Sequence, residues 1–308
     1  MLKFLFIFLT LVFLNSANDL DAKIQIKYKV GGEIITTTDI ENERKYLVFL
    51  RPDLKNLSND EIIKISENSL IRDMIKKKEI DKVFKDLDNK IIINEVKNKL
   101  ISFKKVKNEN EFRNLLYKAN IDYDKIIEKT KYEAFWNELI FQKYNSLIRI
   151  DEKQLKYDLK TKISSNKKFE YNISELLFEI ENNENINKKY DEIIAYIKTN
   201  NFKSAATRFS ISNSSSNGGN IGWIKETLLS DNLNKLLKNL KKNQITKPIK
   251  YPNGYLLLKI NDKRELKQKI DFDRELKDLI NFEKNKQLNQ FSLLFYKKLK
   301  QSTIINEY

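Results

Sequence analysis

The chain is 308 residues long, contains neither cysteine nor histidine, and carries a formal charge of +15 from 58 basic and 43 acidic residues. Its length suggests about two domains. The missing residue types exclude a thiolate nucleophile, a catalytic imidazole, a disulfide and a zinc site of cysteine and histidine ligands. We therefore expect no metal and no cofactor.

The positive charge is spread along the whole chain. Lysine and glutamate alternate in most segments, and no basic cluster is interleaved with aromatic residues. This pattern favours a solvated basic surface over a nucleic-acid site. We predict no nucleic-acid partner, and a binder of nucleic acid or anionic surfaces is the least favoured of three readings.

The N-terminus has the pattern of a secretion signal. Lys3 precedes an apolar run from Phe4 to Leu14, which is shorter than the ~20 residues that a spanning helix needs. Small residues follow, so we predict a signal peptide over residues 1–22, cleaved after Ala17 or Ala22. An uncleaved signal anchor is the alternative. An exported chain without cysteine fits the periplasm, with no stable membrane insertion after cleavage.

A short hairpin followed by helices is predicted for the first half of the mature chain. Residues 24–36 alternate apolar and polar side chains around Gly31-Gly32, which is typical of a β-hairpin. Apolar residues then recur at helical spacing as far as residue 162. The run Ile91-Ile92-Ile93 is too wide for one buried face and leaves room for an apolar client groove.

Two helix starts carry the spacing of a capping box. Thr38 with Glu41 and Ser58 with Glu61 each place a hydroxyl three residues before a carboxylate. We expect helices to begin at both places.

The second half is predicted to be a β/α unit followed by a helical tail. Composition changes near 164–168, which indicates a linker. The elements expected after it are a strand at 171–180, a helix at 186–200, a polar loop at 212–217, a strand at 221–224, a helix at 231–240, a turn at 252–254 and a strand at 255–260. A helix at 272–299 and an edge strand within 302–308 complete the chain.

A set of motifs in this unit resembles one enzyme family. Residues 202–210 read Phe-x-x-Ala-Ala-x-x-Phe-Ser, and the polar loop leads into Gly-Gly-Asn-Ile-Gly-Trp at 218–223. Lys-Pro-Ile at 247–249 and Asn-Gly-Tyr at 253–255 follow in order. The stretch from Phe202 to Lys259 thus resembles the parvulin-type peptidyl-prolyl isomerases.

The resemblance extends over the whole chain. The signal, the Gly-Glu-Ile-Ile-Thr hairpin at 32–36, the helices, the Ile-Asp-Glu helix entry at 150–152 and the C-terminal helix and strand are together similar to SurA and related exported foldases. It implies an α+β fold with a helical chaperone domain at 23–165, a parvulin-like domain at 166–266, and a C-terminal segment at 267–308 that packs on the N-terminal domain. One parvulin unit is present, where the SurA pattern has two.

The resemblance also locates a site, although its usual histidines are replaced. The two histidine positions fall on Glu175 and Leu256, and the cysteine or aspartate of the polar loop falls on Ser212. The resemblance implies a substrate-binding set made of Leu229 and Leu233 for the proline pocket, Ile221 as a further wall, and Trp223 and Tyr255. The alternative is that the pocket residues are simply core.

These replacements predict binding rather than turnover. Rotation about a peptide bond has a barrier of ~18–20 kcal/mol, and a leucine can neither donate nor accept the hydrogen bonds that would help to lower it. We predict a periplasmic chaperone for unfolded or proline-containing polypeptides, with outer-membrane proteins as clients, whose isomerase domain is weak or inactive. An active peptidyl-prolyl isomerase acting on exported proteins is the alternative.

Overall fold

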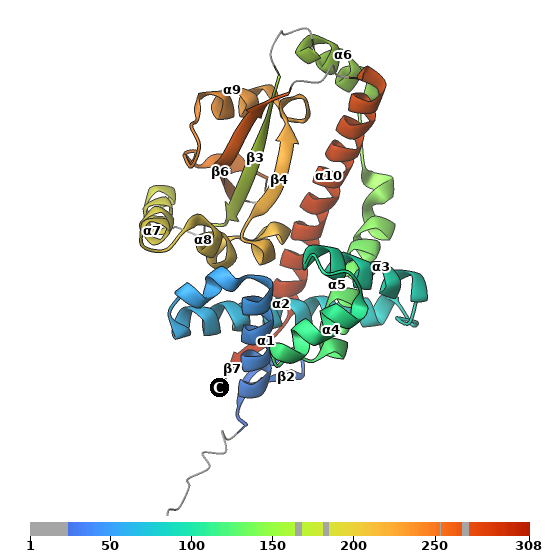
Figure 1. Cartoon of the computed structure of the whole chain (residues 1–308), viewed down its shortest axis with the longest axis vertical. Helices are drawn as coiled ribbons and strands as arrows, with labels where there is room; N and C mark the ends of the chain where they lie inside the picture. The colour runs from blue at the N-terminus through green and yellow to red at the C-terminus, as the bar shows by residue number, and fades with distance from the viewer. Residues whose placement is uncertain (1–23, 164–167, 181–184, 253, 267–270) are drawn as a thin grey trace, which may run out of the picture.

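The computed structural model describes residues 24–163, 168–180, 185–252, 254–266 and 271–308. The predicted signal peptide, most of the predicted linker and Asn253 of the predicted turn lie outside the described residues. The rest forms a mainly helical part and a four-stranded sheet with its own helices, and a long C-terminal helix runs beside both (Figure 1). The predicted α+β fold is confirmed.

The helical part contains six α-helices. They are α1 (Thr37–Leu50), α2 (Asn59–Val83), α3 (Lys90–Phe103), α4 (Glu109–Lys118), α5 (Tyr123–Tyr144) and α6 (Glu152–Ile163), with short 3-10 turns at η1 (Pro52–Asn56) and η2 (Asn145–Leu147). The largest apolar cluster packs α1, α2, α3, α4 and α5 around Leu54, Phe112 and Leu116, which are almost fully buried. Burial of this kind supplies most of the stability of short helices.

One of the two predicted capping boxes is confirmed and the other is wrong. Ser58 caps α2 and forms the predicted reciprocal pair with Glu61. Helix α1 instead begins after Thr36, whose hydroxyl accepts from the backbone N–H of Asp39 while the Asp39 carboxylate accepts from the backbone N–H of Thr36. Aspartate can close a box as glutamate does, so the helix starts two residues earlier than expected.

A three-stranded sheet joins the two ends of the chain. Strands β1 (Ile26–Val30) and β2 (Glu33–Thr36) form the predicted hairpin, and the C-terminal strand β7 (Ile305–Glu307) pairs antiparallel with β1. Gly31 turns the hairpin at φ +57°, and a Cβ there would lie 3.0 Å from the Lys78 ammonium nitrogen. Because Lys78 donates to the Gly31 carbonyl at 2.7 Å, the turn is held against α2.

The second sheet is antiparallel with strand order β4-β3-β6-β5. Its strands are β3 (Phe169–Phe178), β4 (Asn220–Lys225), β5 (Ile249–Tyr251) and β6 (Gly254–Glu265), and its connections contain α7 (Ile186–Thr199), α8 (Phe202–Phe209), η3 (Asn213–Asn217), η4 (Glu226–Leu228) and α9 (Asp231–Asn239). We call β3 to β6 the sheet unit. Helices α7 and α8 pack on one face of its sheet and α9 on the other.

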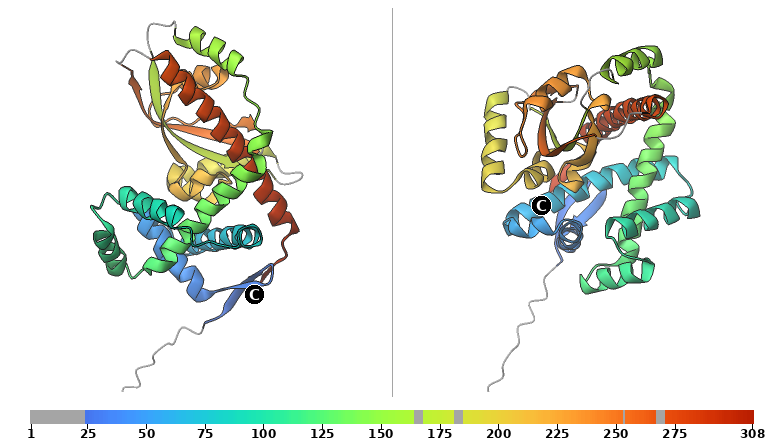
Figure 2. Two further views of the ribbon diagram at one scale, coloured as in Figure 1. Left: turned by 90° about the vertical axis from the view of Figure 1, so that its right-hand side faces the viewer. Right: turned by 45° about the horizontal axis from the view of Figure 1, so that its top comes forward.

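Helix α10 (Phe272–Ser302) spans the length of the molecule and leads into β7 (Figures 1 and 2). Phe295 of α10 stacks on Trp136 of α5 with ring centroids 5.6 Å apart, and the Trp136 indole donates to the Ser292 hydroxyl at 2.9 Å. α10 is 31 residues long, yet among the described residues no helix is apolar enough over a sufficient length to cross a membrane.

The sheet unit meets the helical part through polar side chains. Arg51, which is only 5% exposed, donates to Asp53 at 2.8 Å and also to the Thr207 hydroxyl of α8. Arg208 pairs with Glu61 at 3.0 Å, and Arg72 donates to Ser215 at 3.4 Å. An interface of this type is easier to separate than an apolar one.

The stacked pair between α5 and α10 predicts a large effect of one substitution. Phe295→Ala should lower the free energy of unfolding by about 3–5 kcal/mol, because a ring that is 8% exposed leaves a cavity beside Trp136. Its neighbour Leu294 is 51% exposed, so Leu294→Ala should stay within about 0.5 kcal/mol of the natural chain. Urea denaturation followed by far-ultraviolet circular dichroism measures both, and equal losses would contradict the packing described.

Candidate functional site

The two replaced histidine positions lie on the same face of the four-stranded sheet. Glu175 of β3 is opposite Leu258 of β6, and Leu177 is opposite Leu256. Residues directly opposite each other in an antiparallel pair point to the same face, as do residues two apart on one strand. The sheet therefore places Glu175 and Leu256 on one face, two residue pairs apart.

Glu175 is held by the polar loop. The hydroxyls of Ser212 and Ser214 donate to the same carboxylate oxygen at 2.5 and 2.8 Å. The structure thus brings Ser212, the predicted loop position, to Glu175, and Ser214 is a second donor that sequence reasoning missed. The 3-10 turn η3, which follows Ser212, brings the two serines to one side of the loop.

The loop reaches Glu175 because a glycine follows it. The carbonyl of Gly219 accepts from the Glu175 backbone N–H at 2.7 Å, and a Cβ on Gly219 would lie 2.0 Å from the Glu175 carbonyl oxygen. Its φ of +75° also favours glycine. An ionised carboxylate only accepts hydrogen bonds, so this arrangement has no imidazole-like group that both donates and accepts.

Three of the predicted positions meet in one apolar cluster. We call it the leucine cluster; its buried members are Tyr171, Ile173, Leu177, Leu229, Leu237, Leu256, Leu258 and Ile260. Leu229 and Leu256 are each 6% exposed, and Leu233 of α9 packs against them from the edge. Leu256 thus faces packed side chains, which leaves no room for a hydrogen-bonding group at that position.

The other predicted binding residues are not in this cluster. Tyr255 stacks on Phe178 at 6.0 Å and belongs to the cluster on the opposite face of the sheet. Trp223 is paired with Asn172 and lies beneath the Arg264 guanidinium at 4.1 Å. Ile221 is the extra residue of a β-bulge and is 37% exposed. Trp223 and Tyr255 therefore lie outside the leucine cluster, although the resemblance groups them with Leu229 and Leu233 in one substrate-binding set.

A groove lies in the helical part, away from the leucine cluster. It has a volume of about 930 Å³, lies between α1, α2 and the start of α5, and has apolar walls that include Tyr46, Leu70, Met74 and Ile121. Tyr117 stands at its edge and is 86% exposed. We call this the helical groove. It does not contain the run Ile91-Ile92-Ile93, where Ile92 packs into the core instead.

The floor of the helical groove contains a buried ion cluster. Lys129 donates to both Glu43 oxygens at 3.0 Å and also to Asp73. Burial alone would lower the pKa of Lys129, but the carboxylates of Asp73 and Glu43 outweigh it and raise that pKa above its ordinary value. Burial, followed by the nearby charge of Arg72, lowers the pKa of Lys76 to about 8.

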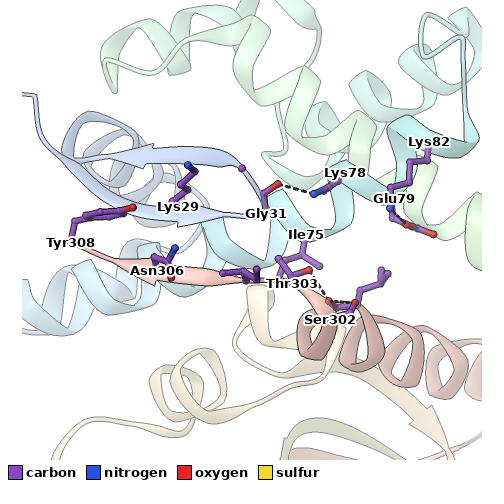
Figure 3. Close-up of a pocket in the computed structure, with 13 residues that line it drawn as sticks. Lys29, Gly31, Ile75, Lys78, Glu79, Lys82, Ser302, Thr303, Asn306 and Tyr308 are labelled. Carbon is purple, nitrogen blue, oxygen red and sulfur yellow. Dashed lines mark hydrogen bonds and ion pairs between the residues drawn. The ribbon is translucent and has the colours of Figure 1, made fainter.

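A second cavity, of about 470 Å³, lies at the turn of the three-stranded sheet (Figure 3). Lys29, Lys78 and Lys82 surround it, and Lys78 reaches across to Gly31 while Lys82 pairs with Glu79. It is formed by β1, α2 and the end of α10, so it has no part in the predicted parvulin site.

Comparison with known proteins agrees with this geometry. Residues 172–262 match the family model described as "Rotamase: PPIC-type PPIASE domain". The chaperone SurA of Pseudomonas putida is 26% identical over 162 residues, which are 50% of this chain and 38% of that protein. The foldase protein PrsA of a Geobacillus strain is 25% identical over 273 residues, or 84% of this chain and 82% of that one.

A solved structure described as one of two SurA-like chaperones, PEB4 and Cj1289 of Campylobacter jejuni, covers 92% of this chain and 98% of its own at 18% identity and a TM-score of 0.38. The chain spans little more than a third of the SurA chaperones that it matches, 38% and 35%. The sheet unit is thus a PPIC-type domain. Beyond this domain, the chain is similar to the chaperone SurA over half of its length and to the foldase protein PrsA over 84% of it.

The burial of Leu256 predicts that restoring the family's histidine there will not succeed. Leu256→His should cost about 2–4 kcal/mol of unfolding free energy, because it empties part of the leucine cluster and buries an imidazole without a partner. Leu236→His is the matched control, since Leu236 is 45% exposed and should tolerate the change. Thermal unfolding compares them, and an unchanged midpoint for Leu256→His would show that this position is open.

Proposed function

We propose that this protein is a periplasmic chaperone that binds unfolded exported polypeptides, with outer-membrane proteins among its clients, and that its parvulin domain is weak or inactive as an isomerase. The helical groove carries the proposal. Its volume of about 930 Å³ is large enough for several side chains of an extended segment, and its walls combine apolar surface with amphipathic tyrosines. The SurA and PrsA relatives, a chaperone and a foldase by name, support it.

The domain division follows the same proposal. We take residues 1–22 as the signal, 23–165 as the chaperone domain, 166–266 as the parvulin domain and 267–308 as a segment that returns to the chaperone domain. The pairing of β7 with β1 and the packing of α10 on α5 support the last boundary. Clients would then be bound by a domain built from both ends of the chain.

The geometry of the sheet unit argues for weak isomerase activity. Catalysis of prolyl rotation depends on polar groups that stabilise the twisted amide better than the planar one. Glu175 accepts two serine hydroxyls and offers no proton, and Leu256 is apolar and buried. The matching family model is the observation that favours the second candidate function, an active isomerase.

Activity with a proline-containing peptide separates the two candidates. In a protease-coupled assay we expect the mature protein to isomerise the prolyl bond no faster than about tenfold above the uncatalysed rate, since the family's histidine positions, which would help to stabilise the twisted amide, are occupied by Glu175 and Leu256. The same preparation should keep a denatured outer-membrane protein soluble at stoichiometric ratio. Fast turnover without protection would favour the isomerase.

The helical groove predicts which surface tyrosine affects chaperone activity. Tyr117→Ala should weaken protection of a client against aggregation severalfold, measured by light scattering during dilution from urea, because Tyr117 stands at the edge of the groove. Tyr157→Ala is the matched control: Tyr157 is 68% exposed on α6 and does not line the groove. Equal protection by both variants would place the client site elsewhere.

A further inference from the structure

Helix α10 covers the leucine cluster. Leu293 packs against the cluster that contains Leu229, Leu233 and Leu256. Close by, the Gln290 side-chain amide donates to the Tyr251 hydroxyl of β5 at 3.4 Å. Figure 2 shows α10 crossing the sheet unit at an angle to its strands. Leu293 of α10, a helix that lies outside the parvulin domain in sequence, therefore contacts the cluster to which the apolar positions of the predicted proline site belong.

Ion pairs hold the sheet unit to α10 on both sides of this contact. Near the start of the helix, the Lys225 ammonium group lies 2.6 Å from Glu275 and 3.3 Å from Asp278, and Thr227 also donates to Glu275. Near the end of the helix, Lys297 pairs at 2.7 Å with Glu179, the residue that follows β3. Glu275 is 3% exposed, so its interaction with Lys225 is screened less by salt than a pair at the surface.

The helix uses opposite sides for its two partners. With 3.6 residues per turn, Gln290, Leu293 and Lys297 form one stripe, which faces the sheet unit. Ser292 and Phe295 lie on the other side and pack on Trp136 of α5. Because the contact with α5 is aromatic and buried while the contact with the sheet unit is mostly polar, the sheet unit is the partner that can separate from α10.

We propose that α10 is an autoinhibitory cover on a peptide site formed by Leu229, Leu233 and Leu256 of the parvulin domain. We call this site the proline cradle. The cradle binds a proline-containing segment only when the sheet unit moves off α10, which stays anchored on α5. The inference rests on the proposed function to the extent that the cradle is a peptide site. If only a small fraction of molecules is open, the apparent affinity for peptide is lower than the affinity of the open form. A substitution that weakens the cover raises the open fraction and should therefore tighten peptide binding.

The test measures binding of a fluorescently labelled proline-containing peptide by anisotropy. Leu293→Ala removes the apolar contact and should tighten binding about tenfold, whereas Leu294→Ala, at an exposed neighbour, should leave it unchanged. Lys297→Glu breaks the pair with Glu179 and should tighten binding in the same direction, whereas Lys298→Glu makes the same charge change beside it. Lys297 is half exposed, so this variant keeps the test valid if Leu293→Ala does not fold.

A covalent lock provides the converse measurement. The chain has no cysteine, so Tyr251→Cys with Gln290→Cys introduces the only two thiols, and a short bismaleimide joins β5 to α10. Cross-linking should abolish peptide binding to the cradle. Binding that is unchanged by the lock, or no tighter in Leu293→Ala than in Leu294→Ala, overturns the proposal.

The same samples keep this result separate from the proposed chaperone function. Protection of a denatured client depends on the helical groove, which the lock does not touch. Protection that persists in the locked protein while peptide binding is lost supports the cover. If Tyr117→Ala protects the client less well but binds the peptide normally, the result tests the helical groove as the client site. It does not bear on α10 as a cover.

Discussion

The contact between Trp136 and the 292–295 turn of α10 fixes the position of the longest helix. The two rings stack at 5.6 Å, and the indole N–H, which would be costly to bury alone, is satisfied by Ser292. Since α10 ends in β7 and passes over the leucine cluster, its position determines both the three-stranded sheet and the state of the parvulin site. One buried aromatic pair thereby couples the two parts of the molecule.

The predicted site positions in the PPIC-type domain form two chemically different halves. Glu175 with Ser212 and Ser214 forms a satisfied polar group, and Leu256 has become part of the packed leucine cluster. A carboxylate that receives hydroxyl donors is stable at the surface of a sheet, and a leucine is stable in its core. These halves suit a binding surface, because one accepts hydrogen bonds and the other is apolar.

Charge has different roles on the surface and inside. The formal charge of +15 reflects 58 basic against 43 acidic residues spread along the chain, and a net charge of this size acts on association with charged molecules rather than on the fold. In the helical groove, Lys129 is matched by Glu43 and Asp73, so this ammonium group is not buried without a partner. The polar contacts of Arg51 and Arg208 join the sheet unit to the helical part.

The sequence by itself determined the class of fold, most helices and strands, the hairpin and the Ser58 capping box, whereas the assignment of parvulin site positions to Glu175 and Ser212 stays a prediction. These depend on local periodicity, on glycine and capping residues, and on motifs with fixed spacing. The first capping box was misplaced because Asp39 can act as Glu41 would, and local spacing does not distinguish them. Only the tertiary structure decided that Leu256 is buried, that Trp223 and Tyr255 lie away from it, and that Leu293 covers the cluster. Those facts depend on strand register and on contacts between residues far apart in the chain, which no local pattern encodes.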